Sequence, residues 1–545
     1  MTLTALGAGP FQGVFDSRDP FDDASKPNML QDAQNMYCPD SATSGGFYAR
    51  PGFTQTAPSY AAALTPPGSQ MGAAYTMVAL DGTLYRFFAF NGKLYRLSGA
   101  SFVTSTDVTP VGVTIDASAT PGGRLYMNQL GNSLIFTDGV NRPWIGTNLS
   151  ATPITGTYID IDGAAGAWTA QGAPVVYQGS LFFIAKTVPG GSSVTAGLGL
   201  VWSEPNQPAT GYTQAGYANF WNLIEQSAYP IYALAATNNT LYYFRESSIG
   251  AVSGTPGSNF SSTATRDLVS ANVGTRAPAS VVQFLDYIYF VDRMGRPYRF
   301  QPGSVPEELW KQLRGQIDAN PSYLQYPNAT ALVGVGCLVP QLNVVLLGGW
   351  SSSPTNNSSN SPLGPTTVYC FDAMTGKYYG RWSGATSSGL TTFDVLTPMH
   401  DPTGAPTIVA FTNQGISQHL YLLGLLSSGV WQDNSQVPTI TAKTQRLGYA
   451  ANVVWNATDT GTIITQSTAP VTVTVTTPYT ASTTEITAGS PASSSDGTYR
   501  LVFGMDVLEA RGIQVTMQPT TATSQWVLQR VEFPADSSLA TLSDQ

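Results

Sequence analysis

The sequence predicts an all-β protein whose larger part is a β-propeller. Three observations predict this class: four short strands joined by tight turns, the recurrence of that unit along the chain, and a polar surface built with few charges. The unit is clearest at residues 71–109, where runs rich in aromatic and branched residues occupy 73–80, 83–90, 93–97 and 101–108. Asp81-Gly82 and Asn91-Gly92 separate the first three runs, and such pairs favour two-residue type I′ turns.

The second of these runs has two apolar faces. Leu84, Phe88 and Phe90 fall on one side of the expected strand, and Tyr85, Phe87 and Ala89 fall on the other. A strand that is covered on both sides fits a sheet stacked between other sheets. A single sheet of this kind is not stable alone, so the chain is expected to hold more of them.

The pattern of strand, tight turn and aromatic strand does recur along the chain. Further copies lie at 125–137, 175–185, 231–245 and 281–291, and weaker ones at 333–347 and 408–422. The turns are roughly 45–70 residues apart, a period typical of propeller blades or arrays. Radial stacking of four-stranded blades leaves only short, protected edges. We therefore predict six to eight blades, with a set of unrelated β-sandwiches as the alternative.

Two further elements complete the predicted architecture. Ser304, Pro306 and Glu307 match a capping box with proline in the first turn, which predicts one short helix near 305–318. Beyond residue 436 the runs 471–475, 513–517 and 526–531 alternate with period two, as in strands with one solvated face. The predicted domains are an N-terminal arm and entry segment (1–70), the propeller (71–435) and a smaller C-terminal β-sandwich (436–545).

The composition restricts the function classes. Charged residues make up 10% of the 545 residues, against roughly 25% in ordinary domains. The net charge is −9 and no run of Lys or Arg occurs, which argues against tight binding of nucleic acid. No signal peptide or apolar run of membrane-spanning length is found, so we expect synthesis and folding in a cytoplasm.

The residues that could carry chemistry form no known catalytic pattern. His400 is expected in a turn and His419 in a strand, and neither belongs to a triad or a metal motif. Glu204 beside Trp202 could line a pocket, although such a residue more often ends a strand. The string SSSDGTY at 493–499 lacks the spacing of a sialidase Asp-box. We expect no enzyme activity, no catalytic residues and no cofactor.

Two sets of residues could bind metal, but their spacing is wrong for it. Asp16, Asp19, Asp22 and Asp23 could hold calcium, yet they do not form an EF-hand loop and are expected to be turn and cap carboxylates. The three cysteines are Cys38, Cys337 and Cys370. They are too far apart for a zinc pattern and odd in number, so we expect small core residues.

Three stretches together resemble the tail nozzle proteins of short-tailed bacteriophages, also called packaged-DNA stabilisation proteins, with the related tubular tail protein B. They are PNMLQDAQNMY leading to ARPGF (27–53), LVWSEPNQPATGYTQAGYANFW (200–221), and 229–300 with TLYYFRESSIGAVSGT and NVGTRAPASVVQFLDYIYFVDRMGRPYRF. The closing segment EARGIQVTMQPTTATSQWVLQRVEF also looks like theirs. The resemblance covers about half of the chain.

The resemblance implies a structural virion protein of the tail. Such a protein forms a ring, expected to be a hexamer, beneath the head–tail adaptor, and it retains packaged DNA and lets it pass on ejection. Tail fibre, spike or needle proteins would be further partners, contact with DNA would be transient and non-specific, and no membrane is involved. No catalytic residue belongs to that role.

Two other functions remain open at this stage. A carbohydrate-binding propeller would use exposed aromatic residues such as Trp202, and a receptor-binding tail component would lie at the tail periphery instead of on its axis. The polar segments 186–198 and 351–366 could gate a channel or merely decorate it.

Overall fold

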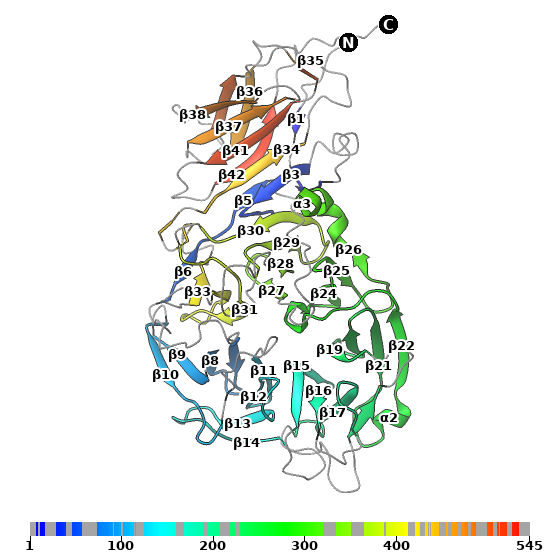
Figure 1. Cartoon of the computed structure of the whole chain (residues 1–545). Coiled ribbons are helices and arrows are strands. Elements are labelled where there is room, and N and C mark those ends of the chain that lie inside the picture. Colours follow the sequence, from blue (N-terminus) through cyan, green and yellow to red (C-terminus); the bar gives the residue numbers. More distant parts are fainter. Residues whose placement is uncertain are drawn as a thin grey trace, which may run out of the picture.

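The computed structural model describes residues 7–8, 11–16, 29–39, 46–56, 73–90, 92–99, 102–113, 115, 125–159, 168–188, 194–207, 219–223, 229–319, 334–349, 365–385, 388–412, 420–425, 431–433, 435–436, 438–445, 454–455, 460–466, 470–477, 481–486, 499–504, 510–511, 513–519 and 526–532. Within them the chain forms a ring of seven four-stranded antiparallel units, with a second all-β unit at one side of the ring (Figure 1). The predicted β-propeller is confirmed, and the number of blades lies inside the expected range.

The first three blades are up-and-down meanders in chain order. Blade one comprises β7 (Ala73–Val78), β8 (Leu84–Phe90), β9 (Lys93–Ser98) and β10 (Thr104–Asp107). Blade two comprises β11 (Tyr126–Leu130), β12 (Ser133–Thr137), β13 (Trp144–Asn148) and β14 (Thr155–Tyr158). Blade three comprises β15 (Thr169–Tyr177), β16 (Ser180–Thr187), β17 (Gly199–Trp202) and β18 (Phe220–Asn222).

The other four blades follow the same plan. Blade four comprises β19 (Ile231–Ala236), β20 (Leu241–Arg245), β21 (Ile249–Ser253) and β22 (Thr265–Ser270), with α2 (Phe260–Thr263) before β22. The 3₁₀ helix η2 (Pro278–Ser280) leads into blade five, which comprises β23 (Val282–Phe284), β24 (Tyr287–Val291), β25 (Pro297–Phe300) and β26 (Glu307–Glu308). Blade six comprises β27 (Val335–Val339), β28 (Val344–Gly348), β29 (Val368–Asp372) and β30 (Tyr378–Trp382). Blade seven comprises β31 (Val395–His400), β32 (Pro406–Phe411), β33 (Leu420–Leu423) and β6 (Phe53–Gln55).

The ring is closed by a strand from the opposite end of the chain. The first strand of each blade lies beside the first strand of the next, and β31 of blade seven returns to β7 of blade one. The outermost strand of blade seven is β6, which pairs antiparallel with β33 in the register Phe53↔Leu423. The last blade is therefore completed by a segment from before blade one, which ties the two ends of the propeller region together.

Aromatic side chains fill the space between adjacent blades. Phe88 and Phe90 of β8 contact Phe411 of blade seven, with ring centroids 5.1 and 4.8 Å apart. Phe87, on the other side of β8, belongs to the core that blade one shares with Phe136 of blade two. The prediction that this strand is covered on both faces is therefore confirmed, and the burial explains why an aromatic run recurs in the blades.

The second unit is a β-sandwich in which N-terminal and C-terminal strands alternate. One sheet has the order β39 (Tyr499–Gly504), β36 (Thr460–Thr465), β42 (Val527–Glu532), β5 (Phe47–Ala49) and β4 (Met36–Tyr37), with β1 (Gly7–Ala8) beside β42. The other has the order β3 (Met29–Gln34), β34 (Thr441–Thr444), β41 (Gln514–Pro519), β37 (Val471–Thr476) and β38 (Ala481–Ile486), with β2 (Gly13–Val14) beside β3. A short pair joins β35 (Val454–Trp455) to β40 (Ala510–Arg511). In β37 the valines are buried and the threonines half-buried, as the period-two pattern predicts.

The sandwich is continuous with the propeller. Strand β3 pairs in parallel with β30 at Gln34↔Arg381, so one ten-stranded sheet runs from β27 at the propeller axis out to β38. A single hydrophobic core contains residues of blades five to seven and of both sandwich sheets. Of residues 1–70, the described strands β1–β5 belong to the sandwich and β6 belongs to the propeller.

The turn at Asp81-Gly82 differs in type from the expected one. At Asp81-Gly82 only Gly82 has a positive φ, 84°, and Ala79 and Thr83 already pair, so the predicted type I′ turn is wrong and the connection is a longer one with a glycine bulge. At Gln178-Gly179 both residues have positive φ, 47° and 80°, and a two-residue loop does join Tyr177 to Ser180. Asn91 lies outside the described residues.

The predicted helix begins later than its capping motif. Ser304 belongs to a turn, where its hydroxyl bonds the backbone of Gln301, and Glu307 lies in β26. The helix starts as a 3₁₀ segment, η3 (Leu309–Leu313), and continues as α3 (Arg314–Ala319). The capping-box prediction is wrong because β25 pairs with residues 307 and 308, which places them in the sheet.

The closure of the ring makes a prediction about Gly52. A Cβ atom at this position would collide with the backbone of Gln432, whereas one at Gly257 would meet nothing within 4 Å. We expect Gly52→Ala to lower the free energy of unfolding by about 1–3 kcal/mol, the usual range for forced overpacking. Gly257→Ala is the matched control and should leave it nearly unchanged. Equal urea midpoints for the two variants would contradict this account of the closure.

Candidate functional site

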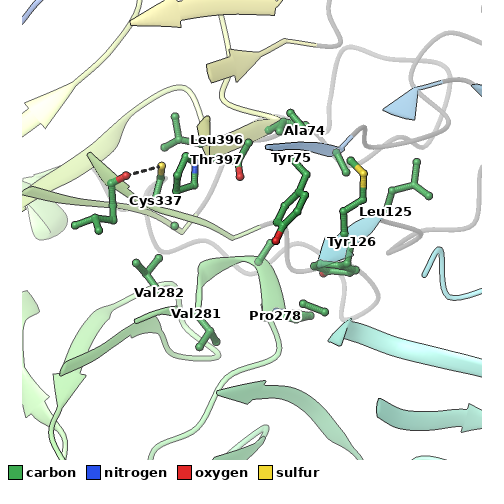
Figure 2. Close-up of a pocket in the computed structure, with 18 of the residues that line it drawn as sticks. Ala74, Tyr75, Leu125, Tyr126, Pro278, Val281, Val282, Cys337, Leu396 and Thr397 are labelled. Atoms are coloured by element: carbon green, nitrogen blue, oxygen red, sulfur yellow. Dashed lines mark hydrogen bonds between the residues drawn. The ribbon is translucent and has the colours of Figure 1, made fainter. Parts of the chain in front are cut away.

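A cavity of about 340 Å³ lies on the propeller axis (Figure 2). It is lined mainly by small and apolar residues of the innermost strands β7, β11, β23, β27 and β31, together with Ala173 and the 3₁₀ helix η2. Tyr75 projects across the space from β7 in Figure 2, with Tyr126 nearby. The polar groups that line the cavity are Tyr75, Tyr126, Gln283, Cys337 and Thr397.

The described lining of this cavity is neutral. Among the described residues that line it, none carries a carboxylate, imidazole, ammonium or guanidinium group. Burial raises the pKa of the Tyr75 phenol, and its hydroxyl lies 3.4 Å from the amide oxygen of Asn128. Burial also raises the pKa of the Cys337 thiol well above its usual range, so this sulfur stays protonated and unreactive. The described residues therefore give the cavity a neutral and mainly apolar lining.

A dense cluster of buried polar groups lies where the propeller meets the sandwich. Arg50, between β5 and β6, is fully buried together with Asp433. Its Nη1 and Nη2 atoms donate to the two carboxylate oxygens of Asp433 at 2.8 and 2.6 Å. The remaining donors reach Asn35 Oδ1 at 3.0 Å and the carbonyls of Pro51 and Ser383 at 2.8 and 2.7 Å. All five N–H groups of the guanidinium thus have acceptors.

The carboxylate of Asp433 also accepts hydrogen bonds from groups other than Arg50. Its oxygens also accept the backbone N–H groups of Phe53 in β6 and Ala385 after blade six, each at 2.8 Å. The guanidinium carbon of Arg50 lies 5.0 Å from the ring centre of Phe53 and 5.8 Å from that of Trp382, which adds cation–π attraction. The pair therefore ties together the closing strand, blade six and the segment that leads to the sandwich.

A second polar cluster lies on the same junction, around Asp32 of β3. Arg381 of β30 donates to the Asp32 carboxylate at 3.0 Å, and the amide of Gln316 in α3 donates at 3.0 Å. Tyr378 in turn donates its hydroxyl to Gln316 at 2.8 Å. Burial raises the pKa of Asp32 above its usual value, while the charges of Arg381 and Lys443 oppose that shift. This cluster holds α3 against the continuous sheet.

Several aspartates that could suggest catalysis are caps of blade turns. The strings FTDGVNRPW (136–144) and FVDRMGRPY (290–298) repeat one another between the second and third strands of blades two and five. Asp138 accepts the backbone N–H groups of Val140 and Asn141, and Asp292 accepts those of Met294 and Arg296. Sequence reasoning missed this repeat, although the shared F-x-D-x-x-x-R-P-aromatic spacing could have revealed it. These carboxylates are committed to backbone donors.

The residues singled out from the sequence are not brought together. His400 ends strand β31 instead of lying in a turn, so that expectation is wrong; its pKa is lowered by burial and by Arg86. Glu204 follows β17 and accepts a hydrogen bond from Asn219 at 3.0 Å. Trp202 is fully buried, stacked on Phe182 at 5.5 Å, so it is not the exposed aromatic residue that a carbohydrate site would need.

The remaining predicted residues fall partly outside the described residues. The backbone of Asp16 bonds that of Gln312 and Gly315, and this carboxylate packs on the start of α3. His419, Asp19, Asp22, Asp23 and the segments 189–193, 351–364 and 493–498 lie outside. All three cysteines are buried and free, as expected. Among the described residues no cluster of three potential metal ligands occurs, and no helix is long and apolar enough to cross a membrane.

Comparison with known proteins gives a fold likeness alone. No protein-family description and no curated protein matches the chain. The computationally designed Ika8 protein is similar over 65% of this chain and 99% of its own, at 11% identity and a TM-score of 0.34. BBS1N, in complex with ARL6DN, is similar over 69% and 98%, at 9% identity and a TM-score of 0.39. Chaetomium thermophilum Raptor is similar over 69% and 29%, at 11% identity and a TM-score of 0.37. These likenesses carry no argument about function.

The Arg50–Asp433 pair makes a prediction about stability. Asp433→Asn leaves a buried guanidinium without its counter-charge, which should lower the free energy of unfolding by about 3–5 kcal/mol. The matched control is Asp107→Asn, because Asp107 pairs with Lys93 at 2.8 Å on the surface, with side chains 42% and 54% exposed. That change should cost less than about 1 kcal/mol. Similar urea midpoints for both variants would show that the buried pair does not hold the junction.

The raised pKa of Asp32 predicts a pH dependence of known sign. A carboxyl whose pKa is higher in the folded than in the unfolded state binds more protons when folded, so its contribution to stability falls as pH rises from about 3.9 through the raised value. The free energy of unfolding of the wild type, relative to Asp32→Asn, should therefore decrease as pH rises over this window.

Asp81 is the control, because its pKa is shifted in the opposite direction and stability should change with pH in the opposite sense. The backbone N–H of Thr83 lowers the pKa of Asp81, so the wild type should gain stability relative to Asp81→Asn as pH rises towards and past the usual value. Urea titrations at several pH values measure both differences. A difference for Asp32 that grows with pH would mean that Arg381 and Lys443 outweigh burial.

Proposed function

We propose that this protein is a structural component of a bacteriophage tail, a nozzle that extends the head–tail channel, retains packaged DNA and lets it pass on ejection. The observation that carries the proposal is the continuous scaffold made by the propeller and the sandwich. They share one ten-stranded sheet and one core, and the N-terminal strands build both. The described polar clusters are committed to holding this scaffold together.

The sequence stretches that resemble nozzle proteins coincide with the architecture. Residues 27–53 supply β3, β4, β5 and the start of β6, and their ARPGF string contains the buried Arg50 and the tightly packed Gly52. Residues 200–221 supply most of β17 and β18, and residues 229–300 supply blade four and three strands of blade five. The resemblance thus falls on elements that define the fold, which supports a shared architecture.

The conduit in this proposal is not the propeller axis. A cavity of about 340 Å³ is at the small end of the range for small-molecule pockets, and duplex DNA does not fit into it. A channel for DNA would have to be enclosed by several copies, joined by heterologous contacts that close a ring. A hexamer seated on the head–tail adaptor, with fibre, spike or needle proteins attached, is the assembly that we propose.

The proposal is tested on the particle itself. Phage particles carrying an epitope tag on this chain should show the tag in a ring on the tail axis, in electron micrographs of immunogold-labelled tails. Particles made without the protein should fail to keep their DNA, which nuclease protection of the packaged genome measures. A tag at the tail periphery, or absent from the particle, would contradict the proposal, and the former result would favour a receptor-binding component.

A further inference from the structure

The two faces of the propeller carry different charge. In each blade the turns between strands one and two, and between strands three and four, lie on one face, which we call the hairpin face. The turns between strands two and three, and the links to the next blade, lie on the other, which we call the link face. This division follows from the antiparallel order of every blade.

The link face collects cations that are far apart in the sequence. The described cations there, in blades one to five, include Lys93, Arg142, Lys186, Arg276 and Arg293. Among the described residues of that face, the accessible carboxylates of the same blades are Asp107, Glu246 and Glu308, and Glu308 is paired with Lys311 at 2.8 Å. Asp138 and Asp292 are only 4% and 3% exposed, and both cap turns. The sequence shows no basic run because each of these cations comes from a separate connection or strand end.

The best-placed pair is Arg276 and Arg293, in blade five and the link before it. Both guanidinium groups lie near one carboxylate, Glu246, at 3.9 and 4.0 Å. The Arg293 side chain is 50% exposed, and Arg276 lies 5.6 Å from the ring centre of Tyr232. One carboxylate shared by two cations leaves a net positive charge at the surface.

The other cations of the link face make contacts of different kinds. Lys186 donates to the carbonyl of Gly139 at 2.8 Å, and the Arg142 guanidinium stacks 4.4 Å from the ring centre of Tyr158. Lys93 is paired with Asp107, but both are exposed, so water and salt screen the pair. Positive charge is therefore spread over successive blades.

The hairpin face has the opposite balance. Asp81 and Asp286 are exposed there, and the Glu307 side chain is 56% exposed beside Arg299. Two arginines near this face are turned inward: Arg86 donates to the carbonyls of His400 and Asp401, and Arg96 donates to that of Leu149. Arg266, at the start of β22, is exposed beside the exposed Asp267. The described charges therefore favour the link face over the hairpin face for contact with a polyanion.

We infer that the link face is the face that contacts nucleic acid, through the phosphates of duplex DNA. The inference rests on the proposed function, because it identifies which side of the propeller meets the passing genome. Cations spread over several blades fit a polymer with regularly repeated charge, which can touch many of them at once, better than a small anion. The net charge of −9 keeps such contacts weak, as a surface that DNA must slide past requires.

The test measures how DNA binding depends on salt. Full-length protein is titrated onto a short fluorescent DNA duplex at increasing salt, and fluorescence anisotropy gives the binding constant. The plot of log K against log salt has a negative slope, and each lost phosphate contact should reduce its magnitude by about 0.9. The double variant Lys186→Gln with Arg293→Gln should therefore lose about two such steps and bind several-fold more weakly at low salt. Arg293→Lys, in place of Arg293→Gln, should restore one step.

The control removes a cation from the opposite face. Lys377 lies in the β29–β30 turn of the hairpin face, and Lys377→Gln should leave the slope unchanged, while unfolding midpoints confirm that all variants are folded. Equal slopes for the wild type, the double variant and Lys377→Gln, or no salt-dependent binding at all, would overturn the inference. This outcome is distinct from failure of the proposed function, because the immunogold experiment locates the protein independently of DNA affinity.

Discussion

The buried pair of Arg50 and Asp433 is the interaction on which the rest of the structure depends. The closing strand β6, blade six and the segment that enters the sandwich all meet at these two side chains. Without the pair, ring closure would depend on the three-residue pairing of β6 with β33 and on the core shared by blades one and seven. A buried ion pair is no guarantee of net stability, since a well-packed apolar replacement can be equally stable. What the bidentate geometry adds is direction, because a guanidinium fork fixes the angle at which its partners approach.

A continuous sheet extends that constraint across the molecule. The pairing of β3 with β30 joins blade six to the sandwich, so the strand order runs without a break from the propeller axis to β38. Sheets joined in this way share backbone hydrogen bonds as well as side-chain packing, and the common core adds burial on both sides. The junction itself is one backbone pair, Gln34↔Arg381, so the common core and the polar clusters also resist movement of the sandwich relative to the propeller. In the proposed ring, this continuity would help each copy to keep the same shape.

Local patterns in the sequence were enough to predict most of the fold. Tight turns between aromatic runs predicted the hairpins of the blades, since a propeller blade is built from neighbouring strands. Alternation in residues 471–475 predicted β37 in the same way. The long-range strand pairings could not be predicted from local patterns, because they join residues hundreds of positions apart. These pairings are β6 with β33, and β3 with β30 and β34. Ser304 misled for a related reason, because a good capping motif lost to the pairing of Glu307 and Glu308 with β25.

The charged residues were the hardest to interpret, and their scarcity explains why. In a chain with 10% charged residues, each buried charge needs a specific partner that only the tertiary structure supplies. Arg50 forms an ion pair with Asp433, Asp32 with Arg381, and Asp292 with Arg296 of its own turn. These charged groups therefore have structural partners inside the fold. The position of the exposed charges is set by the antiparallel order of the strands in each blade, because successive turns lie on opposite faces of the propeller. A weak and uniform charge in the sequence thus becomes an unequal charge on two faces, and any charged partner would meet one of them first.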